Sequence, residues 1–163
     1  MFQALVLSTL LFLAQKPEVG VIAGNVVGPD QLKITQPVQV VLFSQPYANL
    51  WSQKLQEQLD LYWERYKPAF AQKKELFFEV SRMAYRDAMQ FVMARMSRDL
   101  GSNLKTYRID STADGKFEFR NVPVGDYKIV AYGRAGEQVY YWQESVELTA
   151  SFPQFVQLKK HVP

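Results

Sequence analysis

Few residues of this 163-residue chain could carry out chemistry. It has one histidine, His161, and no cysteine, so disulfides, thiol nucleophiles and thiolate metal sites are all excluded. A single histidine near the end of the chain is a poor basis for acid–base catalysis or metal binding, because both need partner groups in a fixed geometry. No phosphate-binding glycine loop, nucleophile elbow or paired-carboxylate motif is present. The sequence therefore predicts a protein that is not an enzyme, with no catalytic residues, no metal and no cofactor.

Two groups of carboxylates remain as candidates for cation binding. Asp110 and Asp114 precede Gly115, but Ca²⁺ takes about six or more oxygen ligands and this segment offers two carboxylates. A second group lies on two predicted helices and comprises Glu57, Asp60, Glu64, Glu75, Glu79 and Asp87. Carboxylate metal sites in helical pairs also use histidines, and these helices contain none. The preferred interpretations are a turn for the first group and a solvated helix face with ion pairs for the second.

The net charge of +3 is small, and the basic residues are scattered among acidic ones. This pattern is typical of a mixed, solvated surface and not of a nucleic-acid interface. We therefore expect no nucleic-acid partner.

The elements that would position a binding site are clearest in residues 106–130. Asp114-Gly115 is a strong turn signal, because glycine tolerates the positive φ of a primed turn. Phe117 and Phe119 alternate with charged residues, which is the period of a half-buried strand. A second turn over 122–126 contains proline and glycine. The stretch predicts three short antiparallel strands joined by two tight turns.

The same stretch resembles a known family. Asp-Gly-Lys-Phe-Glu-Phe at 114–119, followed by Val-Pro-Val-Gly-Asp-Tyr-Lys-Ile at 122–129, is similar to the carboxypeptidase regulatory-like domains. These are small sandwiches of transthyretin-like (prealbumin-type) topology. The resemblance covers about residues 19–44 and 106–158, and it implies a fold and no particular substrate. Transthyretin-like hydrolases rely on histidines in their site, so the resemblance does not imply that activity here.

The middle of the chain, about residues 45–105, lies outside the resemblance and is predicted to be helical. Apolar residues recur at spacings of three and four over 50–66 and again over 77–96. Pro68 lies between these stripes and either ends the first helix or kinks a longer one. A hairpin of two antiparallel helices is preferred, because an insertion must return its chain to the sandwich. We expect the reversal at Lys67–Pro68 or near Gln72–Lys74.

These patterns together predict a mainly β protein, α+β overall. We expect a seven-stranded antiparallel β-sandwich of transthyretin-like topology, with a long α-helical hairpin inserted between strands two and three. The sandwich domain would comprise residues 15–45 and 105–160, and the inserted hairpin residues 46–104.

The first 14 residues are apolar apart from Gln3, Ser8 and Thr9. A run of this length suits the core of a signal peptide and is too short to span a membrane. We therefore predict a signal peptide over residues 1–14 and an exported protein, either secreted or located in the periplasm or cell envelope. The alternatives are an added N-terminal strand, or an uncleaved segment that tethers the protein to a membrane.

Apolar residues on the second predicted helix could bind a partner. Methionine and aromatic residues cover more than one face there, whereas packing in a hairpin needs only one face. Methionine adapts to irregular surfaces, and arginine is favoured at interfaces. The predicted interface for a protein partner or for self-association comprises Phe78, Met83, Met89, Met93 and Arg86. The alternative is that one face packs on the first helix and another on the wall of the sandwich.

Three aromatic residues on a late strand form a second candidate site: Tyr140, Tyr141 and Trp142. Such side chains could stack on sugar rings and make a carbohydrate- or surface-binding module. Alternation along a strand places Tyr140 and Trp142 on one face and Tyr141 on the other, so that one set belongs to the core. The sequence favours an exported, non-catalytic binding or assembly module whose helical insertion makes protein–protein contacts, with carbohydrate binding as the alternative.

Overall fold

The computed structural model describes residues 17–159 and 161–162. The predicted signal peptide, residues 1–14, lies outside these residues. In the part of the chain that is described, no helix has the length and apolar composition needed to span a membrane.

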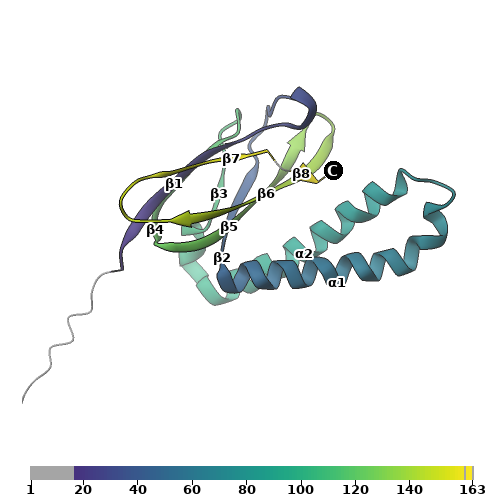
Figure 1. The fold of residues 1–163 in the computed structure, drawn as a ribbon, viewed down its shortest axis with the longest axis horizontal. Helices are drawn as coiled ribbons and strands as arrows, with labels where there is room; N and C mark the ends of the chain where they lie inside the picture. The colour runs from purple at the N-terminus through teal and green to yellow at the C-terminus, as the bar shows by residue number, and fades with distance from the viewer. Residues whose placement is uncertain (1–16, 160, 163) are drawn as a thin grey trace, which may run out of the picture.

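Two β-sheets pack face to face and form the body of the molecule (Figure 1). The smaller sheet has the strand order β4-β1-β7 and comprises Val19–Val26 (β1), Lys116–Pro123 (β4) and Gln154–Leu158 (β7). The larger sheet has the order β3-β2-β5-β6-β8 and comprises Gln39–Ser44 (β2), Arg108–Asp110 (β3), Gly125–Ala135 (β5), Gln138–Leu148 (β6) and His161–Val162 (β8). The predicted mainly β sandwich is confirmed.

The pairing of the strands differs from the expected seven-stranded antiparallel arrangement. β1 and β7 run parallel, with Ile22 opposite Gln154 and Val26 opposite Leu158. The connection after β6 crosses from the larger sheet to the smaller one, and such a crossover allows a parallel neighbour. The described residues also contain an eighth strand, β8, which pairs with β6.

The strands of residues 106–130 form as predicted but do not pair with one another. β4 pairs with β1, whereas β3 pairs with β2 and β5 pairs with β2 and β6. The turn at Gly115, with φ of 84°, therefore joins strands of opposite sheets. A period of two shows that one face of a strand is buried, but it does not show which strand lies beside it.

Side chains from both sheets fill the space between them. Ile22, Phe119, Leu42 and Ile129 are almost completely buried there. Trp142 belongs to the same core, and its Nε1 donates a hydrogen bond of 2.9 Å to the carbonyl oxygen of Val27. This bond connects β6 in the larger sheet to the residue that follows β1 of the smaller sheet.

A helical hairpin lies between β2 and β3 in the chain and comprises α1 (Gln45–Phe70) and α2 (Leu76–Leu100). α1 follows β2 directly, with Pro46 in its first turn, where a missing N–H costs least. α1 continues through Pro68 and ends at Phe70. The chain reverses between the two helices, so the predicted reversal near Gln72–Lys74 is confirmed and the one at Lys67–Pro68 is wrong. A 3₁₀ helix, Gly101–Thr106, then leads to β3, and another, Pro29–Gln31, precedes β2.

The two halves of the hairpin have different surroundings. We call residues 45–58 and 84–100 the proximal half and residues 59–83 the distal half. The proximal half packs on the outer face of the larger sheet, where Trp51, Met89 and Met96 meet Val41, Phe43 and Val130. The distal half has a small core of its own around Tyr62 and Val80, and its reversal projects beyond the sandwich (Figure 1). The alternative in which α2 packs on both α1 and the sandwich wall is confirmed.

Shortening Met89 tests the contact between hairpin and sheet. Met89→Ala removes most of a buried side chain, and we expect a loss of about 2–5 kcal/mol in the free energy of unfolding. The measurement is urea unfolding followed by tryptophan fluorescence. The neighbouring exposed residue serves as the control, because Gln90→Ala should change stability by no more than about 0.5 kcal/mol. Equal effects of the two substitutions would show that α2 is not docked through this residue.

Candidate functional site

The predicted interface on α2 is divided between buried and exposed positions. Met89 is only 3% exposed and lies between α2 and the larger sheet, so its predicted availability to a partner is wrong. The outer face of that sheet is apolar and needs a cover, which Met89 and the partly buried Met93 provide. Met83 is partly buried against the distal core. Phe78 and Arg86 are exposed.

Two of these residues lie beside the sandwich. Met83 and Arg86 line an open cleft of about 400 Å³ between α2 and the β5–β6 turn. Tyr141 and Val139 of β6 form its sheet side. Arg86 also pairs with Asp87 through Nε and Oδ1 at 3.0 Å, so its guanidinium is already engaged within the hairpin.

The aromatic residues of β6 do not form a platform for stacking. Trp142 is fully buried between the sheets, and Tyr141 lies under α2 between Tyr85 and Tyr132, with ring centroids 5.2 and 6.0 Å away. The predicted stacking roles of Tyr141 and Trp142 are therefore wrong. Tyr140 is partly buried and packs against the ring of Trp142 at 6.0 Å. Both faces of β6 are covered at this point, one by the smaller sheet and the other by the hairpin.

One of the carboxylates considered for cation binding, Asp114, stabilises a turn. Asp114 accepts a hydrogen bond from Thr112 Oγ1 and forms an ion pair of 2.8 Å with Lys116. The Lys116 and Thr112 hydrogen bonds lower the pKa of Asp114 to about 2, which keeps this turn residue ionised. Among the described residues, no three histidine, cysteine or acidic side chains are grouped so that they could hold a metal ion.

The distal half of the hairpin carries an exposed aromatic cluster. We define the aromatic patch as Trp63, Phe70, Phe77 and Phe78. The rings contact one another in sequence, with centroids 5.3 Å apart for Trp63 and Phe70, 5.9 Å for Phe70 and Phe77, and 5.7 Å for Phe77 and Phe78. Trp63, Phe77 and Phe78 are nevertheless 44%, 46% and 48% exposed. The patch combines a fixed ring arrangement with a large apolar surface in water.

A pocket of about 190 Å³ opens within this patch. Its lining comprises the apolar residues Leu59, Trp63, Phe70, Phe77 and Val80 and the polar residues Asp60 and Ser81. Pockets that hold drug-sized molecules measure about 300–1,000 Å³, so this one suits a single large side chain. Each of these two polar side chains is oriented by a hydrogen bond within its own helix. Gln56 Nε2 donates to Asp60 Oδ1 at 2.8 Å, and Ser81 Oγ donates to the Phe77 carbonyl oxygen at 2.8 Å.

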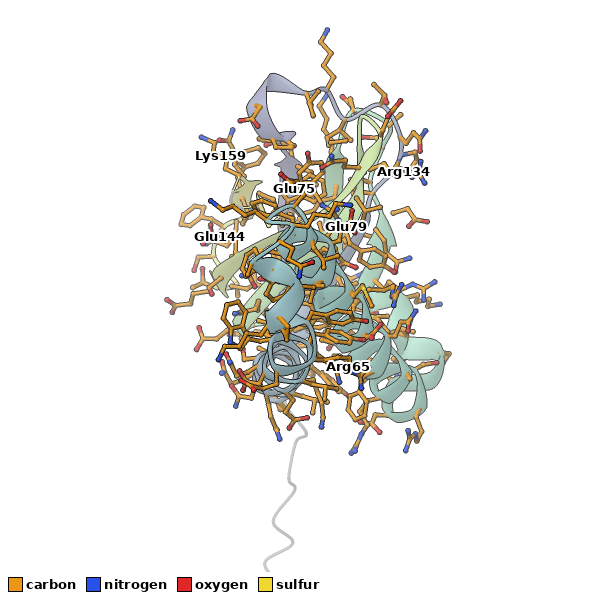
Figure 2. All side chains as sticks on the ribbon, turned by 90° about the vertical axis from the view of Figure 1, so that its right-hand side faces the viewer. Arg65, Glu75, Glu79, Arg134, Glu144 and Lys159 are labelled. Carbon is orange, nitrogen blue, oxygen red and sulfur yellow. The ribbon has the colours of Figure 1, made fainter. Side chains whose placement is uncertain are left out.

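Charged side chains around the patch are not neutralised by one another. The ion pairs of the hairpin, Lys54–Glu57, Arg86–Asp87 and Arg95–Asp99, all lie in the proximal half. Within the described chain, no residue of the distal half forms an ion pair. Figure 2 views the hairpin from its reversal and shows Arg65 on the lower side, with Glu75 and Glu79 on the upper side.

The sequence pattern assigned Trp63 and Phe77 to buried stripes and did not identify the patch. The spacing of both residues fits an amphipathic helix, but the end of a projecting hairpin has fewer neighbours to cover them. The sequence feature that indicates the site is the high density of large aromatic residues on both sides of the reversal: Trp63, Tyr66, Phe70, Phe77 and Phe78.

Comparison with known proteins does not assign a family. No family model matches the chain, and no curated protein does. The pilus backbone RrgB from Streptococcus pneumoniae is similar over 87% of this chain and 41% of its own, with 16% identity and a TM-score of 0.34. The full-length major pilin RrgB from the same organism is similar over 85% of this chain and 30% of its own, with 16% identity and a TM-score of 0.33. The chain thus spans less than half the length of these pilins.

A further solved structure is similar to this chain over nearly the whole length of both proteins. It is a "putative carbohydrate binding protein" from Pseudomonas aeruginosa, with 14% identity, a TM-score of 0.34, and coverage of 88% of this chain and 90% of that one. Similarity at this level does not transfer a function to the present chain.

The buried tyrosines predict how stability depends on pH. Burial raises the pKa of Tyr141 and of Tyr127 to about 12, whereas an unfolded tyrosine titrates near 10. Between these values the unfolded chain loses protons that the folded chain keeps, so the free energy of unfolding falls as pH rises from about 10 to 12. Urea unfolding at several alkaline pH values measures this slope. In Tyr141→Phe the slope should be smaller, and an unchanged slope would show that Tyr141 is not buried under α2.

Proposed function

We propose that this protein is a non-catalytic binding or assembly module whose helical hairpin contacts a protein partner through the aromatic patch. The observation that carries the proposal is the exposure of Trp63, Phe77 and Phe78, nearly half of each side chain, in one contiguous ring cluster. Exposed apolar clusters of this kind are typical of interaction surfaces. Tryptophan and other aromatic residues are enriched at protein–protein interfaces, and tryptophan is frequent at their energetic centres.

The ring arrangement would favour binding. Each ring of the patch is held by its neighbours, with Trp63 and Phe77 in edge-to-face contact at 6.3 Å. A side chain that is already ordered loses little conformational entropy when a partner covers it. The loss of side-chain entropy therefore offsets less of the favourable free energy of burial than it would for flexible side chains.

The sandwich acts as the support in this proposal. Its larger sheet fixes the proximal half of the hairpin, and the distal half then extends away from the sheet into solvent (Figure 1). A resemblance to carboxypeptidase regulatory-like domains would fit such a supporting role, because it concerns the strands and leaves the hairpin aside. Residues 46–104 would be the functional insertion in a sandwich domain of residues 15–45 and 105–160. Export through a signal peptide over residues 1–14 is also part of this proposal, and it would place the partner outside the cytoplasm.

Site-specific crosslinking tests the proposed surface. A photoreactive amino acid replaces Phe78 in the full chain, and crosslinked products are identified in the cells that produce the protein. We expect a specific partner, and we expect the crosslink to be lost in the double variant Trp63→Ala/Phe77→Ala because the surrounding contact area is removed. Circular dichroism and urea unfolding should show that both proteins remain folded.

Phe91 provides the matched control. It is a phenylalanine of α2 that is 50% exposed, but it lies in the proximal half and contacts Lys54. Phe91→Ala should leave the crosslink unchanged. A crosslink that survives Trp63→Ala/Phe77→Ala and disappears with Phe91→Ala would move the interface to the proximal half and contradict the proposal.

A further inference from the structure

We propose that the aromatic patch binds an acidic polypeptide segment that inserts one tryptophan or tyrosine side chain into the pocket between α1 and α2. This inference rests on the proposed function and specifies the chemistry of the partner. It follows from the hydrogen-bonding groups of the pocket wall and from the charges at the reversal of the hairpin.

The wall of the pocket offers acceptors to an incoming side chain. An ionised carboxylate such as that of Asp60 accepts hydrogen bonds and donates none. One of the Asp60 oxygens already accepts from Gln56. The hydroxyl of Ser81 uses its hydrogen toward the Phe77 carbonyl, so its oxygen is left as an acceptor. An apolar side chain that also donates a hydrogen bond complements this wall. Tryptophan and tyrosine have this combination of a large ring and one N–H or O–H donor.

The charge near the reversal favours an acidic segment. The distal half contains five basic side chains and four acidic ones, and they are Arg65, Lys67, Lys73, Lys74, Arg82, Asp60, Glu64, Glu75 and Glu79. Lys73 and Lys74 lie in the reversal itself, between Phe70 and Phe77 of the patch. None of the five basic groups forms an ion pair in the described chain. A partner would therefore place its acidic residues toward the reversal and its aromatic donor toward Asp60.

Two other occupants fit these observations less well. In a symmetric pair of this chain, end-to-end contact would bring the lysines of two reversals together, and like charges at an interface oppose association. A membrane surface could take up aromatic and basic side chains, but a fluid bilayer makes no use of a small pocket lined in part by hydrogen-bond acceptors. The pocket and its acceptors favour a polypeptide.

Selection from a random peptide library displayed on phage tests this chemistry before any natural partner is identified. The full chain is the bait, and peptides that also bind Phe77→Ala are discarded. We expect enriched peptides to contain tryptophan or tyrosine next to aspartate or glutamate. Binding of a synthetic enriched peptide to Lys73→Glu/Lys74→Glu should weaken by about tenfold or more, whereas Lys73→Arg/Lys74→Arg should bind as the unaltered chain does.

The donor is tested separately. Replacing the peptide's tryptophan by 1-methyltryptophan, or its tyrosine by O-methyltyrosine, removes the donor and keeps the ring. We expect affinity to fall by about tenfold, as for loss of a hydrogen bond to a charged group. The same replacement should reduce affinity less for Asp60→Ala, because the charged acceptor is absent there and only the Ser81 hydroxyl remains.

The contrary outcomes separate this inference from the proposed function. Enriched peptides that are neutral or basic, or an unchanged affinity after methylation, would overturn the inference while a crosslink at Phe78 would still support a protein-binding patch. Flotation of the chain with phosphatidylglycerol vesicles, lost in Phe77→Ala, would assign the patch to a lipid surface. A concentration-dependent dimer lost in Phe77→Ala would assign it to a second copy. No enrichment and no crosslink would contradict both proposals.

Discussion

The arrangement of this molecule depends on the burial of the outer face of its larger sheet. Val41, Phe43 and Val130 make that face apolar, and the proximal half of the hairpin covers it with Trp51, Met89 and Met96. Sheets with two apolar faces need a layer on each side, because exposed apolar area is unfavourable in water. The hairpin is therefore part of the packed structure, with the smaller sheet covering one face of the larger sheet and the helices covering the other.

This constraint also determines which part of the hairpin is available for binding. The helices extend beyond the sheet, and their distal half must pack on itself around Tyr62 and Val80. Two helices alone cannot enclose every large side chain, so Trp63, Phe77 and Phe78 remain half-exposed against one another. The same chain segment thus provides a rigid attachment at one end and an apolar surface at the other.

Periodicity in the sequence predicted the elements better than their partners. The turn at Asp114-Gly115, the alternation around Phe117 and the two helical stripes all predicted real elements, because each pattern reports on local geometry and one buried face. The parallel pairing of β1 and β7 was not predictable, since nothing local to either strand specifies its neighbour. Met89 and Trp63 were assigned to the wrong environments for the same reason, because burial depends on where the sheet ends along the hairpin.

Hydrogen–deuterium exchange along the hairpin is the most direct test of this account. Amides of α2 in the proximal half, around residues 88–96, should exchange as slowly as those of β5, because both belong to one packed unit. Amides of the distal half, around residues 63–78, should exchange much faster while the proximal half stays protected. If both halves exchanged quickly while β5 stayed protected, the hairpin would be undocked from the sheet. If both halves were equally protected, the distal half would not be the independent, exposed element on which the account rests.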